Sequence, residues 1–297
     1  MNFKIIIFVI IILISILLIP PFFMPVPTFG GIQLWSDIYI NPDGSRIQQN
    51  LCLRHYRLLD KNNISLTWGS KSQCYKQLYK HTVNTKNNKS DKELVILIHG
   101  LGRTHHSFNK LRKQLNKYGY NAIAISYAST KGSISEHADR LEEILNNLKG
   151  ISKVSFVTHS LGGIILRDTL SRKSPWKEKI KYGRVVQLAP PNNGSSFAKI
   201  IENFKPAIFI LGDTLSELAD EESIKRIPDL PCEYLIIAGD NCYNAFIKTN
   251  NDFIITLDEA RMKNAKSFIT VNSSHTFIMN DPEAIKAIIN FLKKGQK

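Results

Sequence analysis

The stretch VTHSLGG at residues 157–163 decides how this sequence folds. An apolar strand runs directly into a serine and two glycines, and a helical pattern follows. A serine on such a sharp strand-to-helix turn projects its hydroxyl above the sheet, while Gly162 and Gly163 leave room for the helix to pack against the strand. This is the pattern of a nucleophile elbow, with Thr158 where a glycine is usual. The alternative interpretation makes Ser160 an ordinary helix-capping residue.

Outward from this turn, strand and helix patterns alternate from residue 93 to the C-terminus. Buried strands are expected at residues 94–98, 122–126, 154–157, 184–188, 234–237, 253–255 and 268–271. Helices are expected at residues 108–118, 133–148 and 161–170, and after Asp281 and Pro282. Strands that alternate with helices predict an α/β fold whose central sheet is mostly parallel and covered by helices on both faces.

A second loop, HGLG at residues 99–102, follows the first of these strands. With the elbow it resembles the α/β-hydrolase family, and within it the bacterial lipases and esterases that have an HGLG loop and an HSLGG elbow. The segment QLAPPNNGS at residues 187–195 is similar to a segment that such lipases carry after a strand. The resemblance covers residues 93–297 and implies an α/β-hydrolase fold. It also implies that the backbone N–H groups of Leu101 and Leu161 form the oxyanion hole for the tetrahedral intermediate.

A serine nucleophile needs a base to take its proton, and the base needs an acidic group that orients it. In the family that the sequence resembles, the serine comes first, then the acid, then the histidine. Of the eight histidines, only His275 lies well after the elbow, in a polar loop before the final predicted helix. The resemblance therefore implies that His275 is the base for Ser160.

The other histidines near these motifs have different expected places. His99 belongs to the loop implied to form the oxyanion hole, and His159 is the variable position of the elbow, so both are interpreted as structural neighbours of the site. His105 and His106 either line the cleft or lie on the surface near the start of a helix.

Three aspartates are candidates for the acid. Asp252 is preferred because the segment NDFII, followed by EAR at residues 259–261, resembles the lipase pattern N-D-G-x-V with a downstream S-A-R. Phe253 stands where that pattern has glycine, which affects the expected geometry of the loop. Asp240, directly after the strand at residues 234–237, is the second candidate, and Asp258 is the third. For each, the alternative is a carboxylate that caps a helix or lies in a loop.

Residues 1–27 are predicted to be an N-terminal membrane anchor or signal segment. Residues 5–19 are apolar apart from Ser15, and the apolar character continues to about the 20 residues that cross a bilayer. No small-x-small cleavage site follows, which favours a retained anchor over a cleaved signal. Lys4 precedes the segment and Asp37 is the first charge after it, so the N-terminus is expected in the cytoplasm. The catalytic domain would then be periplasmic or extracellular.

Residues 28–92 are predicted to be a β-rich extension with a basic linker. Strands are expected at residues 32–40, 47–59 and 64–68, and they could be edge strands of the main sheet. The polar residues 81–92 are expected to form a surface loop. Residues 51–92 carry nine basic and two acidic side chains, most simply interpreted as a solvated face.

Four cysteines are compatible with an oxidising compartment but lack metal-ligand spacing. A disulfide between Cys52 and Cys74 would fit across a hairpin. Cys232 and Cys242 are expected to be free or structural, because the strand between them would carry the chain away from the first of the two.

The catalytic domain is predicted to extend over residues 93–297. Residues 195–231 form an insertion in it, at the place where such hydrolases carry a cap or lid. Its apolar side chains either line an acyl-chain site or pack the cap on the core. They are Phe197, Ile200, Ile201, Phe204, Ile208, Phe209, Ile210 and Leu211.

Composition narrows the class of protein further. A hydrophobic content of 43% over 297 residues excludes intrinsic disorder of the whole chain. The net charge of +14 would suit an anionic membrane surface or nucleic acid, but no nucleic-acid-binding motif is present, so no nucleic-acid partner is expected. Phosphate-binding loops, dinucleotide fingerprints and zinc motifs are also missing from the sequence, so no cofactor and no metal ion are implied.

Together these observations predict a membrane-anchored serine hydrolase that cleaves carboxylic esters, with a lipid or lipid-like substrate. Ser160, Asp252 and His275 would form its triad. An acyltransferase or a thioesterase would use the same triad, so hydrolysis and acyl transfer both stay open. A non-catalytic function is also open, in which a silent hydrolase fold serves for binding or scaffolding. Its support is that Thr158 and Phe253 depart from the hydrolase pattern. The oligomeric state stays open as well.

Overall fold

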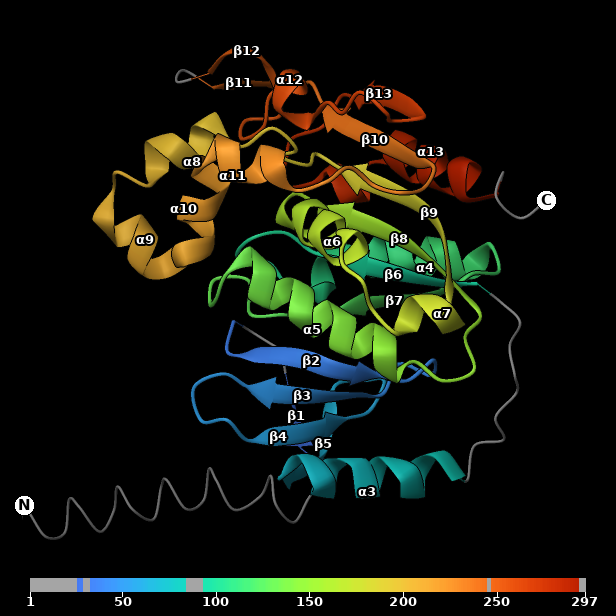
Figure 1. Cartoon of the computed structure of the whole chain (residues 1–297). Helices are drawn as coiled ribbons and strands as arrows, with labels where there is room; N and C mark the ends of the chain where they lie inside the picture. The colour runs from blue at the N-terminus through green and yellow to red at the C-terminus, as the bar shows by residue number, and fades with distance from the viewer. Residues whose placement is uncertain (1–25, 29–32, 84–92, 245–246, 294–297) are drawn as a thin grey trace, which may run out of the picture.

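The computed structural model describes residues 26–28, 33–83, 93–244 and 247–293 (Figure 1). At its centre is a six-stranded sheet in which every neighbouring pair of strands is parallel. The strand order is β13-β10-β9-β8-β6-β7. These strands are β6 (Leu94–Ile98), β7 (Asn121–Ile125), β8 (Lys153–His159), β9 (Lys181–Leu188), β10 (Tyr234–Gly239) and β13 (Ser267–Val271). The predicted α/β fold with a parallel sheet is confirmed.

Helices cover both faces of this sheet (Figure 1). On β6, Ile96 and Ile98 belong to one apolar core and Val95 and Leu97 to the other, because successive side chains of a strand point to opposite faces. The first face packs against α5 (Ile134–Asn147), α6 (Leu161–Ser171) and α7 (Trp176–Lys179). The second packs against η1 (His105–Phe108), α4 (Asn109–Lys117), η2 (Ile278–Asn280) and α13 (Pro282–Lys293).

The helix α5 starts at the expected capping box. The Ser133 hydroxyl accepts a hydrogen bond from the Glu136 N–H at 3.1 Å, and the Glu136 carboxylate accepts one from the Ser133 N–H at 2.8 Å. Two N–H groups of the first turn are satisfied in this way, which fixes where the helix begins.

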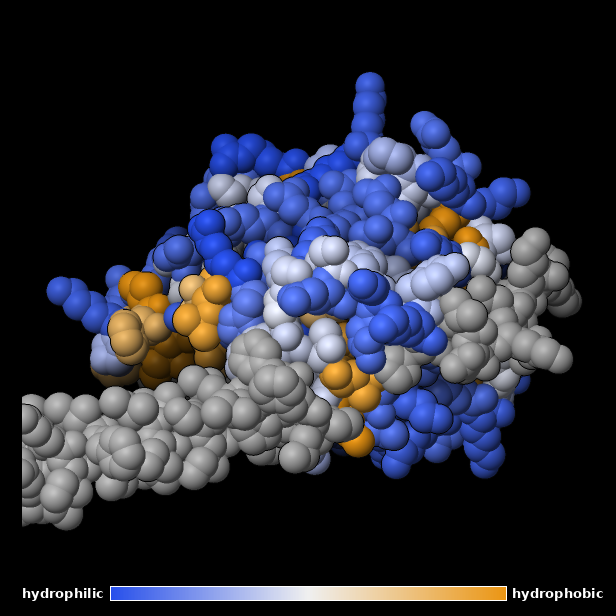
Figure 2. Space-filling model, turned by 90° about the horizontal axis from the view of Figure 1, so that it is seen from below, coloured by the Kyte–Doolittle hydropathy of each residue, from blue (hydrophilic) through white to orange (hydrophobic). Residues whose placement is uncertain are grey.

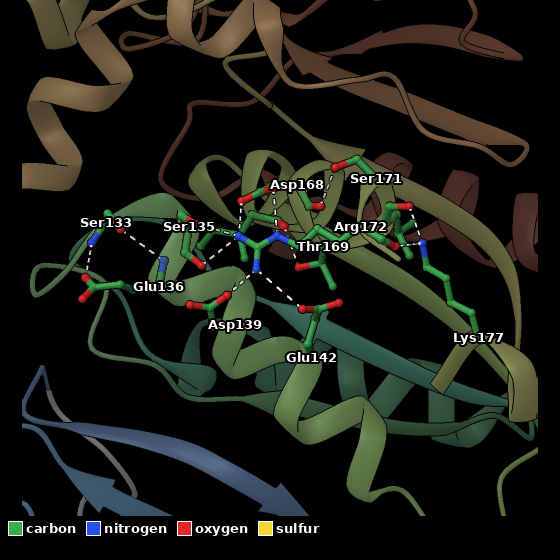
Figure 3. A network of polar contacts seen from close by, with 12 residues as sticks. Ser133, Ser135, Glu136, Asp139, Glu142, Asp168, Thr169, Ser171, Arg172 and Lys177 are labelled. Carbon is green, nitrogen blue, oxygen red and sulfur yellow. Dashed lines mark hydrogen bonds and ion pairs between the residues drawn. The ribbon is translucent and has the colours of Figure 1, made fainter. Parts of the chain in front are cut away.

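Arg172, at the end of α6, ties the elbow helix to α5 (Figure 3). Its guanidinium makes a bidentate pair with Asp168, at 3.0 and 2.8 Å, and donates to the Ser135 carbonyl oxygen at 3.1 Å. Asp139 and Glu142, both on α5, also form ion pairs with it. The Arg172 side chain is 21% exposed, so these contacts are partly shielded from water.

Replacing Arg172 with methionine should lower the free energy of unfolding by about 1–2 kcal/mol, because α6 loses its partly buried polar contacts with Ser135, Asp139 and Glu142 of α5 while the aliphatic stem remains. Urea unfolding of both proteins measures this difference. Lys225→Met is the matched control, since the Lys225 pair with Glu221 is exposed and lies within a single helix. Equal losses in the two variants would contradict the role given to Arg172.

The N-terminal extension forms a sheet of its own rather than extending the main one. Its strands are antiparallel, in the order β1-β5-β4-β3-β2. They are β1 (Val26–Pro27), β2 (Trp35–Ile40), β3 (Arg46–Asn50), β4 (Tyr56–Leu59) and β5 (Ile64–Gly69). The expectation of edge strands on the main sheet is therefore wrong, and the strand predicted at residues 47–59 is two strands. They are separated by a turn in which Arg54 has a φ of 52°.

A helix that the sequence analysis did not predict, α3 (Lys71–Val83), packs on this second sheet (Figure 1). Cys74 and Leu78 of the helix join Ile38, Ile47 and Leu58 of the strands in a separate apolar cluster. The expected surface loop at residues 81–92 therefore begins in a helix, and its residues 84–92 lie outside the described part of the chain.

A buried polar network joins the extension to the edge of the main sheet. Asp37 on β2 accepts hydrogen bonds from the Gln48 amide at 2.8 Å and from the Ser126 N–H at 2.7 Å, and it pairs with Arg46 at 3.2 Å. Burial raises the pKa of Asp37, and the charge of Arg46 opposes that shift. Arg46 also donates to the Ala124 carbonyl oxygen of β7 at 3.1 Å. These contacts fix the position of the extension beside β7.

The predicted disulfide is not present. Cys52 is exposed in the turn after β3 and Cys74 is buried on α3, and both are free thiols, as is Cys232. The bridge prediction is wrong because the chain segment after β5 forms a helix that buries Cys74 against the strands, whereas Cys52 stays exposed in the turn.

Residues 196–226, called the helical cap below, form four short helices beside the carboxyl ends of the strands (Figure 1). They are α8 (Ser196–Ile201), α9 (Lys205–Leu211), α10 (Asp213–Ala219) and α11 (Glu221–Arg226). After β10 come a hairpin of β11 (Cys242–Asn244) and β12 (Ile247–Asn251), and the short helix α12 (Leu257–Ala260). The strand predicted at residues 253–255 is wrong, because this segment is a bend around the Asp252 side chain.

None of the helices within the described ranges combines the length and the apolarity that crossing a bilayer requires. The predicted anchor or signal segment at residues 1–27 lies outside the described residues, except for Val26 and Pro27.

Candidate active site

A cavity of about 330 Å³ lies at the carboxyl ends of the parallel strands, where ligands bind in open α/β sheets. Ser160 follows β8, Leu101 follows β6 and His275 follows β13, and all three line this cavity. The fold thus brings together residues that are far apart in the sequence.

Ser160 has the strained backbone of a sharp turn. Its φ is 51° and its ψ is −125°, a conformation that costs a non-glycine residue about 1–3 kcal/mol. The turn is held from both sides, since the Ser160 N–H donates to the Leu188 carbonyl oxygen at 2.9 Å and its carbonyl oxygen accepts from the Gly163 N–H at 2.8 Å. A Cβ atom on Gly162 would lie 2.5 Å from the Ile98 carbonyl oxygen, so the helix reaches this position only with glycine.

Thr158, which replaces the usual first glycine of the elbow, is fully buried within β8. A Cβ atom on Gly163 would lie 3.3 Å from the Thr158 hydroxyl. The glycine on the helix thus makes room for the threonine on the strand, and the elbow forms despite the departure from the pattern.

Asp252 and His275 form a buried hydrogen-bonded pair. The Nδ1 atom of His275 lies 2.7 Å from Oδ2 of Asp252, and the two residues are 6% and 0% exposed. Oδ1 of Asp252 accepts hydrogen bonds from the N–H groups of Ile254 and Ile255, at 3.0 and 2.7 Å. Both oxygens of the carboxylate therefore accept a hydrogen bond, and His275 Nδ1 is the donor to Oδ2.

The backbone reinforces this pair. The His275 N–H donates to the Asp252 carbonyl oxygen at 2.8 Å. Gly239, the last residue of β10, allows the loop to come this close, because a Cβ atom there would lie 2.7 Å from Cβ of Asp252. The tautomer that results leaves Nε2 of His275 as the free acceptor of the ring.

Ser160 and His275 share the wall of one cavity, but no hydrogen bond joins their side chains among the described residues. Catalytic hydrogen bonds are often loose in unliganded enzymes and tighten when substrate binds, so the arrangement is compatible with a nucleophile and its base.

The backbone N–H groups of Leu101 and Leu161 have no acceptor within the described part of the chain. Leu161 is the first residue of α6, where N–H groups of a helix are unpaired and the helix dipole favours negative charge. Two unpaired donors next to Ser160 are what an oxyanion hole requires.

His99 fixes the orientation of the loop that carries Leu101. Its Nε2 atom accepts from the Tyr127 N–H at 3.3 Å, so Nδ1 carries the proton and donates to the Gly100 carbonyl oxygen at 2.9 Å. Because the peptide group is planar, holding that oxygen also sets the direction of the Leu101 N–H. Burial lowers the pKa of His99 to about 3, so the ring is neutral.

Tyr127 is a site-supporting residue that the sequence analysis missed. Its ring stacks on His99 with 4.2 Å between centroids, and its hydroxyl donates to the His99 carbonyl oxygen at 2.6 Å. Its position just after the strand at residues 122–126 was the available signal, because that edge of a parallel sheet is where sites assemble.

The remaining histidine candidates differ in position. His159 lines the cavity beside His275, with its Nε2 atom 2.9 Å from the His275 carbonyl oxygen, and burial holds its pKa well below the usual range. His105 is buried against Ser126 and His106 is exposed, and neither lines the cavity, so the expectation that they could line the cleft is not met.

The two alternative acids, Asp240 and Asp258, are both exposed. Neither forms a hydrogen bond with His275 among the described residues, whereas Asp252 does. The structure thus brings only the preferred aspartate of the three to the histidine.

The helical cap supplies much of the cavity wall. Phe197, Ile201 and Leu211 line it, whereas Ile200, Phe204, Phe209 and Ile210 are exposed. Seven of the eight predicted apolar residues of the insertion therefore divide into two groups, one lining the cavity and one exposed, and the eighth, Ile208, is half-buried outside the cavity wall. Further apolar wall residues that the sequence analysis did not single out are Leu215, Leu218, Ile254 and Ile255.

Among the described residues, no group of three or more His, Cys, Asp or Glu side chains is arranged to hold a metal ion.

Buried neutral histidines predict a pH-dependent stability. Burial lowers the pKa of His137 to about 4, against about 6.5 in an unfolded chain. Between these values the unfolded state binds a proton that the folded state does not, so the free energy of unfolding falls as the pH falls, by up to roughly 1.4 kcal/mol per pH unit. Urea unfolding between pH 7 and pH 5 measures the slope.

His137→Gln should flatten this slope, because glutamine does not titrate. The exposed His106 provides the matched control, and His106→Gln should leave the slope as in the wild type. An unchanged slope in His137→Gln would mean that His137 does not contribute.

Several solved structures share the fold at low sequence identity. The mature form of Bacillus licheniformis lipase BlEst2 has a TM-score of 0.56 and 18% identity, over 68% of this chain and 92% of that chain. The metagenomic carboxyl esterase MGS0156 has a TM-score of 0.54 and 16% identity, over 69% of this chain and 76% of that one. Phospholipase PlaB from Legionella pneumophila, in complex with thio-NAD, has a TM-score of 0.51 and 14% identity, over 69% of this chain and 63% of that one. These likenesses identify the α/β-hydrolase fold.

Among curated proteins, none matches the sequence. A family model matches residues 63–211, which include Leu101, the elbow and the first two helices of the helical cap, and end before Asp252 and His275. That family is described as a domain of unknown function, DUF7379, and because its model covers just over half of the chain, this protein belongs to it.

Proposed function

We propose that this protein is a serine hydrolase that cleaves carboxylic esters with lipid or lipid-like acyl chains. The observation that carries the proposal is the buried contact of 2.7 Å between His275 Nδ1 and Asp252 Oδ2, made beside the cavity that Ser160 lines. The order of the three residues in the chain and the strained turn at Ser160 support it.

The proposed reaction has two halves. His275 Nε2 takes the proton of the Ser160 hydroxyl as the oxygen attacks the ester carbonyl carbon, and it then gives that proton to the departing alcohol. The resulting acyl-enzyme reacts with water, from which His275 again takes a proton, and the carboxylic acid leaves as the Ser160 hydroxyl is restored. Asp252 stays ionised throughout and stabilises the imidazolium.

The oxyanion of each tetrahedral intermediate would be held by the N–H groups of Leu101 and Leu161. Their unpaired state supports this assignment, because donors already aimed at the site need no reorganisation when the charge develops. Removal of one such donor in other enzymes costs roughly 10²–10³ in kcat.

The acyl part of the substrate is proposed from the apolar side chains of the cavity wall, which include Phe197, Ile201, Leu211 and Leu215. The outward-facing side chains of the cap add to this argument, since Phe204, Phe209 and Ile210 are 63%, 85% and 64% exposed. Figure 2 shows apolar side chains gathered at the side of the molecule where α9 lies in Figure 1. A lipid-like ester would suit both the apolar cavity wall and these exposed side chains of the cap.

We also propose that residues 1–27 anchor the protein in a membrane, with the hydrolase domain on the periplasmic or extracellular side. The support is the apolar sequence of that segment and the single lysine before it. An anchor would keep the cavity close to a lipid substrate.

The full-length protein in detergent, treated with a fluorophosphonate probe, tests the proposed activity. We expect covalent labelling that maps by mass spectrometry to the peptide containing Ser160, together with turnover of p-nitrophenyl esters. A folded protein that neither reacts with the probe nor turns over an ester would contradict the proposal and favour a silent hydrolase fold. Labelling of a different serine would contradict the assignment of the nucleophile.

A further inference from the structure

Phe253, the residue after the candidate acid, has a backbone conformation that a bulky side chain rarely adopts. Its φ is 91°, in the region that favours glycine. The segment requires this conformation, because the chain must turn back for the Asp252 carboxylate to accept from the N–H groups of Ile254 and Ile255. Glycine would meet the same requirement without strain, so the presence of a phenyl ring calls for another explanation.

Burial of the ring does not offset the free-energy cost of this strain. Phe253 is 50% exposed, and it lies outside the cavity itself. Strained residues that persist without a gain in stability are found mainly at functional sites.

The ring does contact the helical cap. Its centroid lies 6.5 Å from that of Phe197, with the two planes tilted by 51°. Phe197 is in the first turn of α8 and lines the cavity. Ile254 and Ile255, directly after Phe253, line the cavity as well. The ring thus joins the loop of the acid to the cap at one side of the acyl site.

We propose that Phe253 is a specificity-determining residue of this site. Its ring holds Phe197 and the start of α8 against the loop of Asp252, and so sets the width of the apolar cavity that receives the acyl chain. The inference rests on the proposed ester hydrolysis. It adds that long acyl chains are selected by the contact of Phe253, which does not itself line the cavity, with Phe197, which does.

Two substitutions distinguish the effect of the Phe253 ring from the effect of its backbone strain. Phe253→Gly removes the ring and the strain, whereas Phe253→Ala removes the ring and keeps a side chain at positive φ. Tyr118→Ala is the matched control, because Tyr118 is 51% exposed and lies at the end of α4, on the opposite face of the sheet. All are made in the full-length protein and assayed in detergent with p-nitrophenyl butanoate and p-nitrophenyl dodecanoate.

We expect both Phe253 variants to lower kcat/KM for the dodecanoate relative to the butanoate by about fivefold, through a higher KM for the long chain. Phe253→Gly should also have a higher Tm than Phe253→Ala, because glycine relieves the strain. Tyr118→Ala should keep the wild-type ratio. A wild-type ratio in Phe253→Gly, or an equal loss on both esters, would overturn the proposal.

A direct binding measurement distinguishes failure of this inference from failure of the proposed function. Absence of turnover and of fluorophosphonate labelling in the wild type would overturn ester hydrolysis. Calorimetric titration of dodecanoate into wild type and Phe253→Gly then tests the cavity alone. Weaker binding by the variant supports the role of the ring, and equal or absent binding overturns it.

Discussion

Replacing Ser160 with alanine should lower kcat/KM for ester hydrolysis by about 10⁴-fold or more and abolish fluorophosphonate labelling. The physical reason is that no other hydroxyl can take its place on the turn. Ser160 has its φ of 51° because the strand β8 and the helix α6 meet there, and the turn places the residue in the cavity wall that Leu101 also lines. The measurement is turnover of p-nitrophenyl butanoate by wild type and variant.

Ser152→Ala is the matched control, because Ser152 is an exposed serine next to the opposite end of β8. It should retain wild-type turnover and labelling. Circular dichroism and thermal unfolding should show that Ser160→Ala is folded with a Tm close to that of the wild type, since alanine keeps a side chain at the same positive φ. A folded Ser160→Ala protein with wild-type turnover would show that another residue is the nucleophile.

Replacing Asp252 with asparagine should lower kcat by about 10⁴-fold while leaving the shape of the loop intact. The carboxylate accepts from His275 Nδ1, which keeps the proton on that nitrogen and leaves Nε2 free to take the proton of Ser160. An asparagine amide group facing the ring would donate instead, and the histidine would then carry its proton on the wrong nitrogen. The oxygen of the same amide can still accept from the N–H groups of Ile254 and Ile255.

The other two aspartates give this experiment its controls. Asp240→Asn and Asp258→Asn should each retain turnover within about twofold, because both side chains are exposed and surface substitutions away from a site have small effects. A large loss in Asp240→Asn, with Asp252→Asn active, would assign the acid to the end of β10 and contradict the pairing described here.

Local patterns predicted the elements around the site well. The central strands and the helices α4, α5, α6 and α13 were predicted within a few residues, because each carries a continuous apolar run or a stripe at helical spacing. The capping box at Ser133 marked the start of α5, and it is present. The elbow and the loop at residues 99–102 could be recognised because tight turns between strand and helix require glycine at particular positions.

Other elements could not be predicted from their own residues. The segment 253–255 has the apolar sequence of a strand, yet it bends because Asp252 draws two of its N–H groups onto one carboxylate oxygen. The helix α3 has a weak apolar stripe and forms where the second sheet offers a surface for Cys74 and Leu78. The position of the second sheet beside β7 depends on the hydrogen bond between Asp37 and Ser126, which are 89 positions apart in the sequence.

The sequence by itself determined the α/β class, through its alternating strand and helix patterns, and its resemblance to the α/β-hydrolases pointed to the candidates Ser160, Asp252 and His275. Only the tertiary structure decided which of three aspartates meets the histidine, which apolar residues of the cap face the cavity and which face outward, and that Phe253 contacts Phe197. The physical reason is that hydrogen bonds and ring contacts act over a few ångströms. Residues separated by dozens of positions come that close only when the sheet and its loops have formed.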